Sequence, residues 1–227
     1  MMTPYQAFLF DLNGTMINDM PYHIRAWHRI LNSLGADISL ERMKEECYGK
    51  NHELLERMFP GRFSMEEKNK MSLEKEIQYQ QEFKPYLKLI SGLNQFLQHS
   101  FQGGIKMAIG SAAIMLNIDF VLDGLNIRSY FNALVSADDV KHSKPHPETW
   151  LTCAKKLKVK PDGCLVFEDV PKGVEAAARA GMDCVVITTI HHRDEFSKFT
   201  NIIRFIEDYE DPALQAFITS SRLEASR

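Results

Sequence analysis

Five short apolar runs recur along the chain, and each is bounded by charged or turn-forming residues. They cover residues 7–10, 105–109, 133–135, 165–167 and 184–187, and only the second contains a charged residue, Lys106. Continuous apolar runs of this length are typical of strands that are covered on both faces, as in a parallel sheet. We therefore expect these segments to be the strands of one buried sheet.

Segments with helical periodicity alternate with the strands after residue 88. We expect helices over 93–99, 113–123 and 211–219, and a helix that Pro171 begins and Gly181 ends. Another helix begins at Pro147 and carries an apolar stripe of Trp150, Leu151, Ala154 and Leu157. The alternation of strands and helices predicts an α/β fold with a doubly wound parallel sheet.

The stretch from 19 to 87 shows helical periodicity and no convincing strand. We expect helices over 21–35, 38–48, 51–59 and 64–83, the last of them strongly charged. This block lies between the first strand and all the others. We therefore expect two domains: an α/β core formed by residues 1–18 and 88–227, and an inserted all-helical cap domain formed by residues 19–87.

Composition narrows the classes of function. The 227 residues are 44% hydrophobic and 25% charged, with a formal net charge of −3. This balance, without a basic tract, gives no reason to expect nucleic acid or membrane as a partner. No signal-peptide pattern begins the chain and the four cysteines are scattered singly, so we expect a reduced, cytoplasmic protein. We also expect a monomer.

Polar residues follow the apolar runs, at the carboxyl edge where parallel sheets usually carry their binding and catalytic residues. They are Asp11 and Asn13, then Ser111, then Lys144, and then Glu168 and Asp169. Each has a structural alternative: an Asx turn, a helix cap, a solvated loop charge, or an acid pair at a helix start. Their occurrence together, each near the end of a strand, favours a catalytic site.

These residues lie in four segments: Phe-Asp-Leu-Asn-Gly-Thr at 10–15, Ile-Gly-Ser at 109–111, Ser-Lys-Pro at 143–145 and Phe-Glu-Asp at 167–169. In these motifs and their order the chain resembles the haloacid dehalogenase-like superfamily, over essentially its whole length. The segment Tyr22-His23-Ile24-Arg25-Ala26-Trp27 is similar to the start of the cap in the β-phosphoglucomutase-like branch.

The resemblance implies a role for each motif residue. Asp11 would attack a phosphoryl group and carry it as an aspartyl phosphate. Mg²⁺ would be held by Asp11, the main-chain carbonyl of Asn13 and Asp169, with Glu168 either a direct ligand or a support for the ligands. Ser111, the neighbouring amide of Ala112 and Lys144 would hold the phosphate oxygens.

Asn13 departs from the pattern of the resemblance, which has a second aspartate there as general acid and base. An amide cannot exchange protons in this way, whereas its main-chain carbonyl can still bind a metal. General acid–base catalysis contributes about 10²–10⁴ in rate. Asn13 therefore weakens chemistry with an alcohol leaving group without preventing formation of an aspartyl phosphate.

Substrate contacts from the helical block are expected at His23, Trp27, Lys50 and His52. His23 could carry a proton or could be a solvated helix-start histidine. The arginine that mutases place in the loop around Lys50 is absent, and Ala112-Ala113-Ile114 replaces a polar run.

We therefore expect a Mg²⁺-dependent phosphatase or β-phosphoglucomutase-like enzyme that acts on a small phosphorylated metabolite, with a sugar phosphate as the favoured substrate. The alternatives are hydrolysis of a carbon–halogen or carbon–phosphorus bond, and a catalytically impaired binder of a phosphorylated ligand.

Overall fold

The computed structural model describes residues 5–218. The chain divides into two compact units, one formed by residues 1–18 and 88–227 and one by residues 19–87. We call them the α/β unit and the helical unit. None of the described helices is long and apolar enough to cross a membrane.

The α/β unit is built on a six-stranded sheet in the order β3-β2-β1-β4-β5-β6, with every neighbouring pair parallel. The strands are β1 (Ala7–Phe10), β2 (Lys106–Gly110), β3 (Ala133–Val135), β4 (Cys164–Glu168), β5 (Asp183–Ile187) and β6 (Ile202–Ile206). The expected doubly wound parallel sheet is confirmed, and β6 is a strand that the sequence analysis missed.

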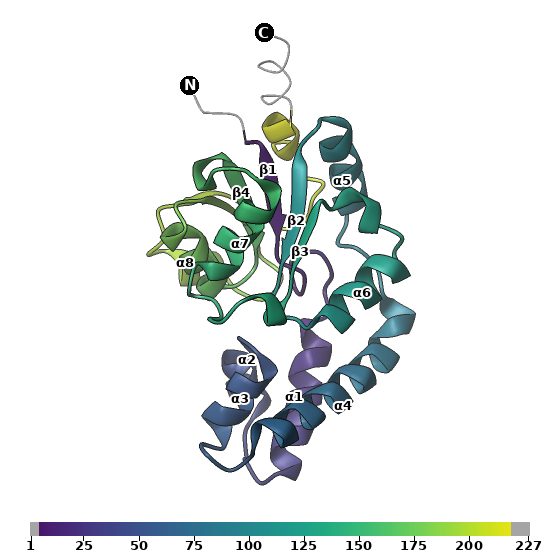
Figure 1. The fold of residues 1–227 in the computed structure, drawn as a ribbon, viewed down its shortest axis with the longest axis vertical. Helices are drawn as coiled ribbons and strands as arrows, with labels where there is room; N and C mark the ends of the chain where they lie inside the picture. Colours follow the sequence, from purple (N-terminus) through teal and green to yellow (C-terminus); the bar gives the residue numbers. More distant parts are fainter. Residues whose placement is uncertain (1–4, 219–227) are drawn as a thin grey trace. The chain divides into compact units, whose positions relative to one another are not determined.

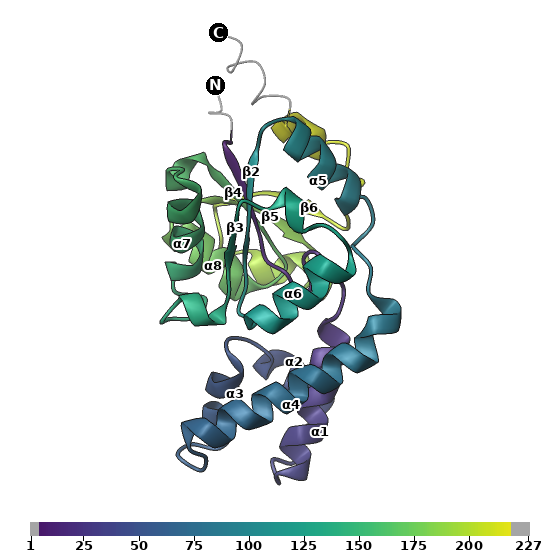
Figure 2. The same ribbon diagram turned by 45° about the vertical axis from the view of Figure 1, so that its right-hand side comes forward.

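Helices cover both faces of this sheet (Figures 1 and 2), with α7 and α8 on one face and α5 and α6 on the other. They are α5 (Leu93–Gln102), α6 (Met115–Gly124), α7 (Glu148–Leu157) and α8 (Pro171–Arg179). Of the helix expected over 211–219, residues 214–218 are helical and residues 211–213 are not, while residue 219 lies outside the described part of the chain. The expected apolar stripe of α7 was wrong at Leu151, which is 40% exposed, while Trp150 is fully buried.

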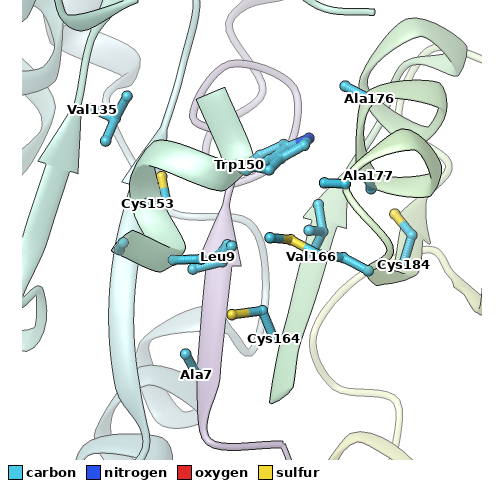
Figure 3. Close-up of a cluster of buried hydrophobic side chains, with 14 of the residues drawn as sticks. Ala7, Leu9, Val135, Trp150, Cys153, Cys164, Val166, Ala176, Ala177 and Cys184 are labelled. Atoms are coloured by element: carbon cyan, nitrogen blue, oxygen red, sulfur yellow. The ribbon is translucent and has the colours of Figure 1, made fainter. Parts of the chain in front are cut away.

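Successive residues of a strand face opposite sides of a sheet, and β1 shows how this builds two cores. Ala7 and Leu9 pack in the cluster with residues of α7 and α8, among them Trp150 and Ala177 (Figure 3). Phe8 instead faces an aromatic group and stacks on Phe96 of α5, with ring centroids 5.4 Å apart. All four residues of β1 are fully buried, so the strand is held firmly where it ends.

The helical unit consists of α1 (Met20–Ser33), α2 (Leu40–Glu46), α3 (Asn51–Met58) and α4 (Met65–Phe83). A short 3-10 helix, Lys84–Tyr86, follows α4. Further 3-10 helices lie in the α/β unit, over Arg128–Tyr130, Ala137–Asp139, Pro161–Gly163 and Arg193–Phe196. The core of the helical unit is a cluster of Trp27, Leu31, Ile38, Met43, Leu54 and Leu55. Ser64 caps α4 by accepting a hydrogen bond from the Glu67 N–H, and the Glu67 carboxylate accepts one from the Ser64 N–H in return, which fixes where this helix begins.

Candidate active site

Asp11 lies directly after β1, between the ends of β2 and β4. Its N–H donates to the Phe167 carbonyl of β4 at 3.0 Å, which continues the strand pairing by one residue. The chain runs from β1 to β2 and β3 on one side and then returns to β4 on the other side. This is the switch point where doubly wound sheets form their binding crevice. Asp11 is 8% exposed there.

Lys144, on the loop between β3 and α7, binds two carboxylates at this point. Its Nζ lies 2.7 Å from Asp11 Oδ1 and 2.7 Å from Glu168 Oε1, and it also donates to the Gly110 carbonyl at 3.1 Å. The ammonium lies 4.2 Å from the centroid of the Trp150 ring. Burial lowers the pKa of Lys144, but the charges of Asp11 and Glu168 raise it by more, so the side chain is a fixed positive charge.

Both carboxylate oxygens of Glu168 are engaged within the protein. Oε1 accepts from Lys144, and Oε2 accepts from the main-chain N–H groups of Asp169 at 2.8 Å and Val170 at 3.0 Å. A Cβ on Gly173 would lie 1.7 Å from Oε1. The Glu168 carboxylate therefore occupies the space that any side chain at position 173 would need, and only glycine fits there. Glu168 thus positions Lys144 and the start of the loop after β4.

Asp169 has one oxygen held and one without a hydrogen-bond partner. Thr15 Oγ1 donates to Oδ1 at 3.1 Å, whereas Oδ2 is buried and no described residue bonds to it. A Cβ on Gly14 would lie 2.0 Å from Oδ2, and Gly14 has a φ of +76°, so only glycine suits this position. Burial, and then the charges of Glu168 and Asp11, raise the pKa of Asp169 well above its ordinary value.

These features fit a hard cation at Asp11 and Asp169. An unsatisfied buried carboxylate oxygen, a glycine that leaves space in front of it, and a second carboxylate nearby form the oxygen-rich set that such a cation prefers. Within residues 5–218, no three His, Cys, Asp or Glu side chains form a complete metal-binding group. A cation here would therefore also need main-chain, substrate or water oxygens.

Asn13 is fixed by its main chain in the turn after Asp11. It forms a bridge with Ile17, and the Gly14 N–H donates to the Ile17 carbonyl at 2.8 Å. Thr189, which follows β5, donates to the Gly14 carbonyl at 2.8 Å. These contacts define the path of the turn from both sides, and the Asn13 side chain is half-buried in it.

Ser111 and Ala112 lie after β2, next to the end of β1. The Ser111 N–H donates to the Val135 carbonyl at 3.0 Å, and its hydroxyl oxygen accepts from the Ala113 N–H at 3.1 Å. Ser111 is 2% exposed. Its hydroxyl proton and the Ala112 N–H have no acceptor among the described residues, so both are donors suited to an anion.

In the helical unit, His23 belongs to a buried polar cluster. Its Nε2 lies 3.2 Å from Asp19 Oδ2, its Nδ1 lies 2.5 Å from Lys75 Nζ, and its ring stacks on Tyr79. Lys75 also donates to Glu76 Oε1 at 2.9 Å. His23 is 7% exposed, so the alternative of a solvated helix-start histidine is wrong.

The other candidates in the helical unit differ from His23. Trp27 is 2% exposed and packs in the apolar core, because one helical turn separates it from Leu31 on the same face of α1. We therefore assign it to that core. Lys50 is the residue just before α3, where its main-chain N–H donates to the Glu53 carboxylate at 2.9 Å. His52 lies in the first turn of α3, and both residues are half-buried.

Sequence reasoning missed the buried face of α4. Its members are Lys68, Ser72, Lys75, Glu76, Tyr79 and Phe83. Apart from the adjacent Lys75 and Glu76, they recur every three or four residues, which is a helical spacing, but most are polar and the usual apolar signal is absent. The spacing of these polar residues together with Tyr79 and Phe83 was the signal that could have revealed the cluster.

The sequence matches the profile of one protein family and is similar to two phosphatases. Residues 8–187 match the family profile of haloacid dehalogenase-like hydrolases. A fructose-1-phosphate phosphatase from Escherichia coli is 31% identical over 80% of this chain and 95% of its own length. A hexitol phosphatase from the same species is 30% identical over 82% of this chain and 86% of its own length.

One solved structure has a similar fold over nearly the whole chain. A β-phosphoglucomutase from Clostridium difficile superposes with a TM-score of 0.82 at 26% identity, and the match covers 98% of this chain and 100% of that one.

Proposed function

Because this chain belongs to the haloacid dehalogenase-like hydrolases, we propose that it is a magnesium-dependent phosphoryl-transfer enzyme that acts on a sugar phosphate or a related small metabolite. The observation that carries the proposal is the cluster of Asp11, Lys144, Glu168 and Asp169 at the switch point of the sheet. The sugar phosphatases among its relatives support the class of substrate.

Asp11 is the nucleophile in this proposal. Lys144 binds Oδ1 and so orients the carboxylate, and we assign Oδ2 as the oxygen that attacks the phosphorus. The P–O bond to the leaving group breaks as the bond to Asp11 forms, which gives an aspartyl phosphate. Water, or a second hydroxyl group in a mutase, then takes the phosphoryl group from Asp11.

The phosphate oxygens need positive charge and hydrogen-bond donors, since phosphoryl transfer depends on positioning and charge neutralisation. We assign the Ser111 hydroxyl, the Ala112 N–H and the Lys144 ammonium to this task. The Lys144 ammonium would have to share its donors between the phosphate and the two carboxylates that it binds. Glu168 keeps the ammonium in place.

Asp11, Asp169 and the main-chain carbonyl of Asn13 would hold Mg²⁺. When bound, the cation neutralises charge on the transferring phosphoryl group and on the two carboxylates. Since both oxygens of Glu168 are engaged, we assign Glu168 to positioning rather than to direct ligation. His23, Lys50 and His52 stay predictions for contact with the substrate.

Asn13 favours a second candidate function. Without a carboxylic acid at this position, the leaving alcohol is not protonated from it, which costs up to about 10²–10⁴ in rate. The same fold would then bind a phosphorylated ligand with little turnover. Comparing an aryl phosphate with a sugar phosphate separates the two functions, because the sugar leaving group needs protonation and the aryl leaving group needs little.

The test is a panel of p-nitrophenyl phosphate, fructose 1-phosphate, hexitol phosphates and glucose phosphates, with Mg²⁺ and with EDTA. We expect Mg²⁺-dependent release of phosphate from the aryl compound and from at least one sugar phosphate. Asp11→Ala is the matched control for contaminating phosphatases. Tight binding of a sugar phosphate that is not hydrolysed, with phosphate released only from the aryl compound, would support the binder instead.

A further inference from the structure

The loop that carries Lys144 also carries two exposed histidines, one on each side of it. They are His142 and His146, and their ring centroids lie 4.7 Å apart with the ring planes tilted by 48°. Neither ring takes part in the contacts of Asp11, Glu168 or Asp169 described above. We propose that this pair chelates a borderline divalent transition cation such as Zn²⁺.

The spacing of the rings suits shared coordination. Imidazole nitrogens bind Zn²⁺ at about 2.0–2.1 Å, so two rings on one tetrahedral ion have centroids roughly 5 Å apart. The observed 4.7 Å is close to that separation without movement of the main chain. Imidazole is a good ligand for Zn²⁺, Cu²⁺ and Ni²⁺ and a poor one for Mg²⁺, which prefers oxygen.

Glu148 prepares the loop for this role. Its carboxylate accepts from the main-chain N–H of Lys141 at 3.1 Å and of His142 at 3.0 Å, which ties the loop to the start of α7. Glu148 Oε2 also lies 3.8 Å from His146 Nδ1. This distance is too long for a hydrogen bond, but the carboxylate places negative charge beside the ring, which favours a bound cation.

One hydrogen bond to His146 Nδ1 competes with metal binding through Nε2, because it favours the tautomer with its proton on Nε2, and this bond is weak. The Glu148 N–H lies 3.3 Å from His146 Nδ1, which is at the long end of hydrogen-bond distances, so a change of tautomer would cost little. No described residue forms a hydrogen bond with the His142 ring. Two imidazoles supply only part of a coordination shell, in keeping with the absence of a three-residue metal group in the described chain, and water would complete it.

Calorimetric titration of the untagged 227-residue chain with ZnCl₂, in excess Mg²⁺, tests the proposal. The excess Mg²⁺ keeps the carboxylate site occupied, and any zinc that binds there remains in the histidine variants. We expect one zinc ion per chain to be lost in the double variant His142→Ala/His146→Ala. Glu148→Gln should weaken zinc binding by roughly 10–100-fold, as is typical when the group that orients a metal-binding histidine is removed.

The matched control is the double variant His99→Ala/His192→Ala, which removes two exposed histidines from separate elements. It should titrate like the wild-type protein. Identical isotherms for wild type and His142→Ala/His146→Ala would overturn the proposal, and so would one zinc ion per two chains. Because the readout is binding, the result does not depend on the proposed phosphoryl transfer.

Discussion

Replacing Lys144 with methionine removes one positive charge from a buried cluster while keeping a side chain of similar length. The ammonium forms ion pairs of 2.7 Å with both Asp11 and Glu168, and the side chains of Lys144 and Glu168 are 8% and 0% exposed. In the variant, Glu168 keeps its two main-chain donors but loses its counter-charge. Two carboxylates then repel each other in a site from which water is largely excluded.

The size of the effect follows from this burial. Removing one partner of a buried ion pair costs about 3–5 kcal/mol, because the remaining charge is left uncompensated. For a chain of this size, each kcal/mol lowers Tm by roughly 2–4 °C, so the expected drop is about 6–20 °C. Solvent screening does not reduce this figure much at such low exposure.

The pH dependence has a definite sign. Since Asp11 and Glu168 raise the pKa of Lys144 by more than burial lowers it, its folded pKa is higher than its unfolded one. The stability from this group is therefore fully present below the unfolded pKa of about 10.4 and is lost only as the pH rises through the higher folded value. The difference in Tm between wild type and variant should stay constant from about pH 6 to pH 9.

Scanning calorimetry in EDTA measures the difference without bound metal. The matched control is Lys156→Met, which removes an ammonium that binds Asp139 and the Leu134 carbonyl at 2.8 Å each but is 39% exposed. That change should cost no more than about 1 kcal/mol. If Lys144→Met lowered Tm no more than Lys156→Met does, the argument from a buried charge cluster would be refuted.

Two further substitutions probe the turn after Asp11. Gly14→Ala should remove Mg²⁺-dependent turnover, since its Cβ would lie 2.0 Å from Asp169 Oδ2; Gly181→Ala has a similar positive φ but open space, so it should cost only about 1–2 kcal/mol of backbone strain and leave activity intact. Asn13→Asp should raise turnover of alkyl phosphates by up to about 10²–10⁴-fold and of aryl phosphate far less. The intact mass of the wild-type protein is checked first, because the Asn13-Gly14 pair is prone to deamidation. Equal gains on both substrates would contradict a restored proton donor, and an active Gly14→Ala enzyme would contradict the role of Asp169.

The sequence predicted the parts of the fold in which local pattern and burial agree. The first five strands consist mainly of apolar residues, and all but β3 are almost wholly buried in the structure. β6 was missed because it is an edge strand that is mostly half-buried and carries Arg204 in its middle. Arg204 forms an ion pair with Asp211, so its charge is accommodated at the sheet edge.

In the candidate site, the positions of Asp11, Lys144, Glu168 and Asp169 after predicted strands indicated that they meet at one edge of the sheet. In the structure these residues are in contact or close to one another. What a sequence cannot supply is the direction of each side chain. The engagement of both Glu168 oxygens, the space that Gly173 leaves, and the buried cluster around Lys75 depend on packing between distant segments.

The most direct test of the central claim is the turnover of p-nitrophenyl phosphate by Asp11→Ala in saturating Mg²⁺. Lys144 keeps its ion pair with Glu168 in this variant, so Tm should stay near that of the wild type while turnover falls to the rate in buffer. A folded Asp11→Ala protein that still released p-nitrophenol at the wild-type rate would contradict phosphoryl transfer through Asp11.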